Sequence, residues 1–252
     1  MDDACIVGSG MVGKATAKAL SIPFYFDILG SNITLEQAAE KRYIFICLPT
    51  PTIKGRCDTH ELYQIIKQIR DYGKQNIFVI RSTVNPGFCR SLDTSLGIRN
   101  VVHVPEFFTE ATWEKDVENP DIIVIGAESK DYREAVEGIY KARYQRGVEI
   151  ILTDSITSEL IKWAINGFYA TKVVYANEIY DFAQKVGANY ETIKDTMYKR
   201  KWIGKNHLNI WRGDKRGAGG KCLPKDLEAL AEMSQSSLLL KVLERNNHYI
   251  HA

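Results

Sequence analysis

The sequence predicts an α/β protein with a Rossmann-like, doubly wound parallel sheet, followed by a mostly helical domain with a long central helix. Two observations lead to this expectation. Over residues 1–153, short unbroken apolar runs alternate with longer helical patterns, as in β-α-β units whose strands are covered on both faces. After residue 154 the pattern changes to one long helical stretch. We therefore expect a domain over residues 1–153 and a second over residues 154–252.

The elements follow from the same patterns, taken in chain order. Because the apolar runs do not alternate with polar residues, we expect strands that are buried on both faces. They are residues 4–7, 24–27, 43–48, 77–80, 101–104, 122–125 and 148–152. A helix is expected over residues 156–186, ending at Gly187. Residues 199–221, rich in Lys, Arg and Gly, indicate an ordered loop, and helices resume from Pro224.

Composition argues against several classes of protein. Apolar residues make up 45% and charged residues 25%, which is typical of a folded globular chain. The net charge is +2 and the basic residues are interspersed with acidic ones, so no nucleic-acid partner is expected. No apolar run approaches the ~18 residues of a membrane span, and the start does not resemble a signal peptide. Five scattered cysteines indicate no metal site and fit a reducing compartment. We expect a soluble, cytoplasmic protein without a membrane partner.

A cofactor site is predicted directly after the first strand. Residues 8–13 (GSGMVG) place Gly8, Gly10 and Gly13 where a tight turn, a close approach to a pyrophosphate and helix packing need glycine. Asp27 ends the second predicted strand and can hydrogen-bond an adenosine ribose. No Lys or Arg follows directly to accept a 2′-phosphate, so NAD is favoured over NADP. Met11 and Val12 complete this predicted cofactor contact.

A polar stripe is predicted on the long helix. Lys162 and Asn166 are four residues apart and share a face with Glu159, on a helix that is otherwise apolar. Because Lys is rarely buried without a partner, this stripe could line a cavity. The alternative is a lysine whose stem packs while its ammonium reaches water beside Glu159.

A nucleophile is predicted in a glycine-rich loop. Residues 217–226 (GAGGKCLPKD) enter a predicted helix, with Cys222 near its start. Backbone amides and the positive end of a helix lower the pKa of a thiol in such a place. Cys222 is therefore the one cysteine for which we expect reactivity, the others being small core residues.

Six short motifs, in order, resemble those of the UDP-glucose and GDP-mannose dehydrogenase family. They are residues 8–13, 48–51 (LPTP), 81–87 (RSTVNPG), 105–110 (PEFFTE), 159–166 and 219–226. The resemblance implies an NAD-dependent, two-step oxidation of the C6 primary alcohol of a nucleotide sugar, such as UDP-glucose to UDP-glucuronate. A nucleotide sugar is therefore the expected small-molecule partner.

The resemblance also implies roles for individual residues. Lys162, Asp226 and a water near Thr83 would handle the hydroxyl proton, while Lys162 and Asn166 would stabilise charge on the substrate oxygen. Cys222 would attack the aldehyde, and Glu106 would assist hydrolysis of the thioester. The expected cofactor contacts include Thr50, Ser82, Thr83, Glu110 and Lys225. The expected substrate contacts are Glu106, Phe107, Lys162, Asn166, Gly219 and Gly220.

Family members normally continue into a third domain that binds the substrate's nucleotide, and we expect no such domain within these 252 residues. Residues 241–246 resemble the start of the helix that leads to it. Three interpretations stay open: a minimal enzyme, a subunit completed by another chain, or an NAD-binding form without turnover. A single-step hydroxy-acid dehydrogenase is a further alternative, although it would not need Cys222. Residues 173–182 are apolar enough to pack against a second copy, so a homodimer is expected.

Overall fold

The computed structural model describes residues 1–109, 111–144 and 147–251, and the chain divides into two compact units. The first unit comprises Met1–Pro51 and Cys57–Lys162, and the second comprises Thr52–Arg56 and Trp163–Ala252. The sheet of the first unit ends at Thr153. The division between the units falls farther along the chain, within the long helix.

A seven-stranded sheet forms the centre of the first unit, and each of the seven predicted runs contributes one strand. The strands are β1 (Ala4–Val7), β2 (Tyr25–Phe26), β3 (Tyr43–Ile46), β6 (Ile77–Ile80), β7 (Val101–His103), β8 (Ile122–Gly126) and β9 (Glu149–Thr153). Their order is β2-β1-β3-β6-β7-β8-β9. Because β1 lies between β2 and β3, the strand order reverses there, which is the switch point at which such sheets bind ligands.

The expected all-parallel arrangement is wrong at one pairing. β7 and β8 run antiparallel, joined through His103 and Gly126, whereas the strand pairs on either side of them are parallel. In its described residues, the connection between β7 and β8 includes one helix, the six-residue α5 (Trp113–Glu118). Apolar composition gives a strand's burial but not its direction, so the sequence pattern did not reveal this reversal.

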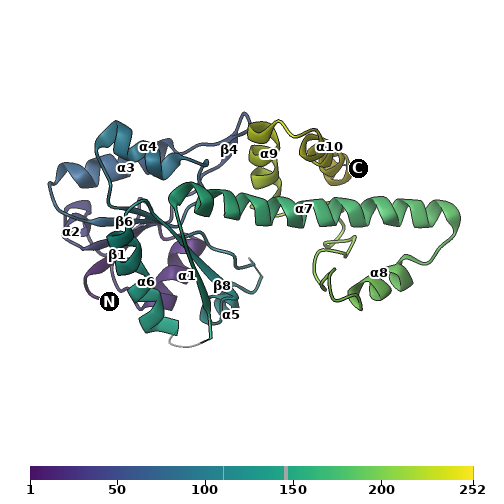
Figure 1. Cartoon of the computed structure of the whole chain (residues 1–252), viewed down its shortest axis with the longest axis horizontal. Helices are drawn as coiled ribbons and strands as arrows, with labels where there is room; N and C mark the ends of the chain where they lie inside the picture. Colours follow the sequence, from purple (N-terminus) through teal and green to yellow (C-terminus); the bar gives the residue numbers. More distant parts are fainter. Residues whose placement is uncertain (110, 145–146, 252) are drawn as a thin grey trace. The chain divides into compact units, whose positions relative to one another are not determined.

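Helices cover both faces of this sheet (Figure 1). One apolar cluster joins the sheet to α1 (Met11–Leu20), α5 and α6 (Lys130–Tyr144). The cluster on the opposite face includes α2 (Leu35–Ala39), α3 (His60–Asp71) and α4 (Phe88–Leu96). The central strands are thus buried on both sides. The expected burial is wrong for β2 and β9, which are partly exposed because they lie at the edges of the sheet.

The second unit is built mainly from helices. They are the remainder of α7 (Ser155–Val186), α8 (Tyr190–Tyr198), α9 (Leu223–Ser234) and α10 (Ser237–His251). Figure 1 shows α7 as one uninterrupted helix. The sequence pattern missed a small hairpin, β4 (Thr52–Ile53) with β5 (Arg56–Cys57), because its strands have only two residues each. Within the described residues, no helix is both long and apolar enough to cross a membrane.

Candidate active site

The glycine turn after β1 has the geometry that its sequence predicts. Gly8 has a φ of 94°, and a Cβ there would lie 2.7 Å from the carbonyl oxygen of Cys47. A Cβ at Gly13 would lie 1.9 Å from the carbonyl oxygen of Gly8. At Gly10, by contrast, nothing lies within 4 Å of the Cβ position, and no side chain caps the start of α1. This open helix start, beginning with Met11 and Val12, is suited to a pyrophosphate.

Asp27 lies just beyond β2 and is tied to the glycine turn. Its carboxylate accepts bonds from the Ser9 amide (2.6 Å), the Ser9 hydroxyl (3.0 Å) and the Leu29 amide (2.9 Å). The bonds from Leu29 and Ser9 hold the pKa of Asp27 below its usual value. The next two side chains, Ile28 and Leu29, are almost fully exposed. Asp27 is therefore a fixed, charged acceptor with no cation directly after it in the chain.

Further predicted cofactor residues lie together at the carboxyl ends of neighbouring strands. The Thr50 hydroxyl donates to the carbonyl oxygen of Thr83 at 2.6 Å, and the Ser82 hydroxyl donates to that of Leu48 at 2.7 Å. These bonds join the segment after β3 to the segment after β6. Thr50 and Ser82 are buried, while Thr83 is partly exposed. The sheet thus brings Thr50, Ser82 and Thr83 to the same edge as the glycine turn.

Lys162 is buried and forms an ion pair with Glu106, which follows β7. Its Nζ donates to the backbone oxygen of Glu106 at 2.6 Å and to Oε1 of Glu106 at 3.2 Å. Glu106 also accepts from the Phe108 amide at 3.1 Å. The Lys162 ammonium lies 5.5 Å from the ring centre of Phe107. Three of the predicted site residues, Lys162, Glu106 and Phe107, therefore lie together. The alternative, in which the Lys162 ammonium reaches solvent beside Glu159, is wrong.

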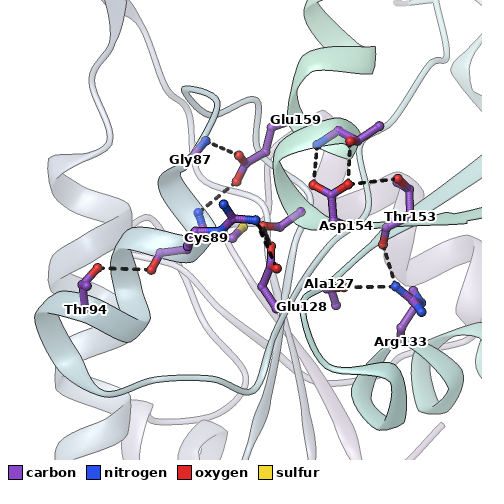
Figure 2. A network of polar contacts seen from close by, with 12 residues as sticks. Gly87, Cys89, Thr94, Ala127, Glu128, Arg133, Thr153, Asp154 and Glu159 are labelled. Carbon is purple, nitrogen blue, oxygen red and sulfur yellow. Dashed lines mark hydrogen bonds and ion pairs between the residues drawn. The ribbon is translucent and has the colours of Figure 1, made fainter.

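Glu159 was expected to share a polar face of α7 with Lys162 and Asn166, but its carboxylate bonds to the start of α4 instead. Its carboxylate accepts from the amides of Gly87 (2.5 Å) and Cys89 (2.9 Å) at the start of α4, as Figure 2 shows. Burial raises the pKa of Glu159. A second tie lies nearby, where Glu128 accepts from both Arg90 and Ser155. These bonds fix the first turns of α7, from which Lys162 projects.

A second set of site residues meets within the second unit. Asn166 Nδ2 donates to Oδ2 of Asp226 at 2.6 Å, and Lys225 Nζ donates to Oδ1 of the same carboxylate at 2.5 Å. Asp226 is fully buried, and Asn166 is nearly so. The hydroxyl of Thr52 donates to the backbone carbonyl of Lys225 at 2.9 Å. The first turn of α9 is thereby held on both sides.

Cys222 stands at the N-cap of α9 and is exposed, whereas the other four cysteines are buried. Burial raises the pKa of the Cys5 and Cys47 thiols to about 12, and it also raises that of Cys89. Pro224 occupies the first turn of α9, as is typical of a helix start. Before Cys222, Gly219 is partly exposed and Gly220 is exposed.

Glu110, a predicted cofactor contact, lies outside the described residues.

Several buried polar residues near these sites were not expected from the sequence. Arg81 is buried and donates from Nη1 to the Val104 carbonyl at 2.9 Å. His103 is fully buried, with Nδ1 2.8 Å from the Ser158 hydroxyl. The amide of Ala218, in the segment before Cys222, donates to Oδ1 of Asn246 in α10. Each of these contacts joins residues far apart in the chain, so spacing alone gives no signal for them.

Family models match most of the chain. The NAD-binding domain model of the UDP-glucose/GDP-mannose dehydrogenase family matches residues 28–143, and the family's central-domain model matches residues 156–248. A UDP-glucose 6-dehydrogenase of Rickettsia felis is 34% identical over 212 residues, covering 82% of this chain and 46% of the relative. The chain spans about half the length of the curated relatives it matches.

Solved structures show a similar fold. A UDP-glucose dehydrogenase from Pyrobaculum islandicum aligns with a TM-score of 0.84 at 23% identity, covering 97% of this chain and 68% of that one. A 3-hydroxyisobutyrate dehydrogenase from Mycobacterium tuberculosis aligns with a TM-score of 0.72 at 14% identity, covering 96% and 91%. At these identities the likeness concerns the fold alone.

Proposed function

Because this chain belongs to the UDP-glucose/GDP-mannose dehydrogenase family, we propose that it is an NAD-dependent oxidoreductase that converts the C6 primary alcohol of a nucleotide sugar to a carboxylate in two steps. One observation supports this most strongly. The exposed Cys222 stands at the start of the helix whose first turn also holds Asp226, itself bonded to Asn166. A single hydride transfer needs no thiol, whereas oxidation of an aldehyde to an acid gains from one.

The first unit offers features that fit NAD. The open position at Gly10, the uncapped start of α1 and the charged Asp27 are suited to the pyrophosphate and the ribose. We assign further cofactor contacts to Thr50, Ser82, Thr83 and Lys225, and to Glu110 on sequence grounds. NAD, when bound, supplies the acceptor for one hydride in each of the two steps.

In the first step, the alcohol loses a hydride and a proton and becomes an aldehyde. We assign the hydroxyl proton to Lys162, Asp226 and a water near Thr83, and the stabilisation of charge on the substrate oxygen to Lys162 and Asn166. The ion pair with Glu106 holds the Lys162 ammonium in one place, so its charge needs little rearrangement as the reaction proceeds. Phe107, Gly219 and Gly220 would contact the sugar.

In the second step, Cys222 forms a bond to the aldehyde carbon. Loss of a second hydride turns this thiohemiacetal into a thioester, and water then releases the carboxylate and restores the thiol. Glu106 would assist that water. Each product therefore requires two NAD and one water.

We also propose that the protein acts as a homodimer through α7. Phe168, Tyr175, Phe182 and Val186 are 62%, 53%, 61% and 58% exposed, and their spacing of seven, seven and four residues places them on one face of the helix. Large exposed apolar side chains repeated along one face of a helix are typical of an interface. The scattered cysteines of the sequence agree with a reducing compartment, so we place the protein in the cytoplasm.

Product stoichiometry tests the proposed activity. With purified protein, NAD and UDP-glucose, we expect two NADH for each uronate formed, together with calorimetric binding of UDP-glucose. One NADH per product would instead favour the single-step hydroxy-acid dehydrogenase. Binding of NAD without any binding of a nucleotide sugar would favour an NAD-binding subunit without turnover.

A further inference from the structure

The loop that precedes Cys222 is tied to α10 through both hydrogen-bonding groups of one residue. The Ala218 amide donates to Oδ1 of Asn246 at 2.7 Å, and Nδ2 of Asn246 donates back to the Ala218 carbonyl at 3.1 Å. Asn246 is fully buried and Ala218 almost so. Two opposed bonds fix both the position and the direction of the loop backbone. Loss of the Asn246 amide would leave two buried backbone groups without their partner, which is unfavourable.

The residue before Ala218 shows how closely the loop approaches α10. Gly217 has a φ of 78°, a conformation that side chains rarely adopt. A Cβ there would lie 3.1 Å from both Oδ1 of Asn246 and Cβ of Tyr249. Glycine therefore allows the backbone to lie directly against the helix.

Arg216 ties the same segment to α7. Its Nε donates to Oδ1 of Asn177 at 2.9 Å, and its Nη2 donates to Oδ1 of Asp181 at 2.6 Å. The guanidinium also lies 4.7 Å from the ring centre of Tyr249 and 5.1 Å from that of Tyr180. Arg216, Gly217 and Ala218 thus make three consecutive contacts with two helices of the second unit.

These contacts fix one end of a short span whose other end is the start of α9. Asp226, bonded to Asn166 and Lys225, holds α9 on the downstream side. Gly219, Gly220 and Lys221 separate Ala218 from Cys222. With both ends held, the intervening backbone has little freedom, which restricts where the side chain of Cys222, at the N-cap of α9, can lie.

We propose that Asn246 and Arg216 are positioning residues that fix the place of the Cys222 sulfur by clamping the loop before it to α10 and α7. The inference rests on the proposed function only in giving Cys222 a chemical role. The clamp itself makes a prediction about thiol reactivity that does not require turnover.

Alkylation of Cys222 provides the test, since it is exposed while the other four cysteines are buried. In Asn246→Ala, the loop is released, and the Cys222 thiol no longer keeps one place at the start of α9, where the positive end of a helix favours the thiolate. We expect its alkylation rate by iodoacetamide at pH 7 to fall at least threefold, kcat to fall at least tenfold, and the Kd for NAD to stay within twofold. Arg216→Lys keeps the charge but cannot form the same pair of bonds, and we expect smaller falls in both rates.

Arg245→Ala is the matched control. Arg245 is the neighbour of Asn246, and its hydrogen bonds are to Glu178 on α7 and Tyr249 on α10. It should lower the melting temperature and leave the alkylation rate within twofold of wild type. An alkylation rate in folded Asn246→Ala that equals or exceeds the wild-type rate would overturn the clamp. If that variant does not fold, an unchanged rate in Arg216→Lys would overturn it. Absence of turnover in the wild type would instead contradict the proposed function, while the alkylation comparison still decides the clamp.

Discussion

The two units hold their chemical groups by different means. In the first, Glu106 and Lys162 lie beside strands that are buried between two large apolar clusters. In the second, the apolar clusters are smaller, and hydrogen bonds from Asn246 and Arg216 hold the loop before Cys222. Substitutions in the two units are therefore expected to affect activity in different ways. A change at the buried Lys162–Glu106 pair removes a proposed reacting group together with its ion pair, whereas a change at the loop alters the position of the proposed nucleophile.

The largest effect is expected at Cys222, the proposed nucleophile in the second unit. Cys222→Ser replaces the thiol by a far weaker nucleophile, so turnover should fall by about 10³ or more while the Kd for NAD changes little. Initial rates and fluorescence titration measure the two quantities. Cys47→Ala is the control, because burial raises the pKa of Cys47 to about 12 and keeps it a thiol. Full activity in Cys222→Ser would exclude the two-step mechanism.

Substitution of Lys162 tests whether the buried ion pair of the first unit serves catalysis, stability or both. Lys162→Met removes the ammonium, and kcat should fall about 10²-fold, as losses of proton handling and charge stabilisation commonly do. It also leaves Glu106 buried without its partner, which costs about 3–5 kcal/mol. Adding Glu106→Gln should restore much of that stability but not the activity. Thermal melts and kcat of the single and double variants separate these effects. A stability loss without loss of kcat would make the pair purely structural.

The pH dependence of stability tests the burial of His103 in the first unit. Burial lowers the pKa of His103 from 6.5 to about 3, with further lowering by Arg81 and Lys162. The unfolded chain therefore binds a proton that the folded chain does not, and stability is lost as the pH falls below 6.5. Between pH 7 and pH 5 this loss is about 2 kcal/mol. Denaturant titrations should show a smaller pH dependence in His103→Gln than in wild type. The exposed His60, changed to Gln, should leave the wild-type dependence intact.

In both units, the sequence predicted local elements and missed contacts between residues far apart in the chain. The strand at residues 77–80 was correct to the residue because a run buried on both faces is a local pattern. The reversal between β7 and β8 and the partner of Lys162 depend on contacts between distant residues, and no local pattern encodes them. The long helix was correct to one residue at its start, because its periodicity is local too. The loop clamp was missed, since Asn246 is 28 residues from Ala218.

The smallest effect concerns cofactor choice at the edge of the first unit. Asp27 has a lowered pKa because the Leu29 and Ser9 amides donate to it, so it stays charged at neutral pH. Its charge would repel a 2′-phosphate, and Ile28 and Leu29 provide no cation to offset it. We expect NAD to bind at least tenfold more tightly than NADP, a difference of about 1.4 kcal/mol. Asp27→Asn removes the charge while keeping an acceptor, and should reduce the preference mainly by improving NADP binding. Ser9→Ala is the control, because it removes one hydroxyl bond to Asp27 but leaves the backbone amide bonds and the charge. Equal affinities of wild type for the two cofactors, measured by fluorescence titration, would mean that Asp27 does not face the ribose, and this edge of the sheet would then hold its ligand by the glycine turn alone.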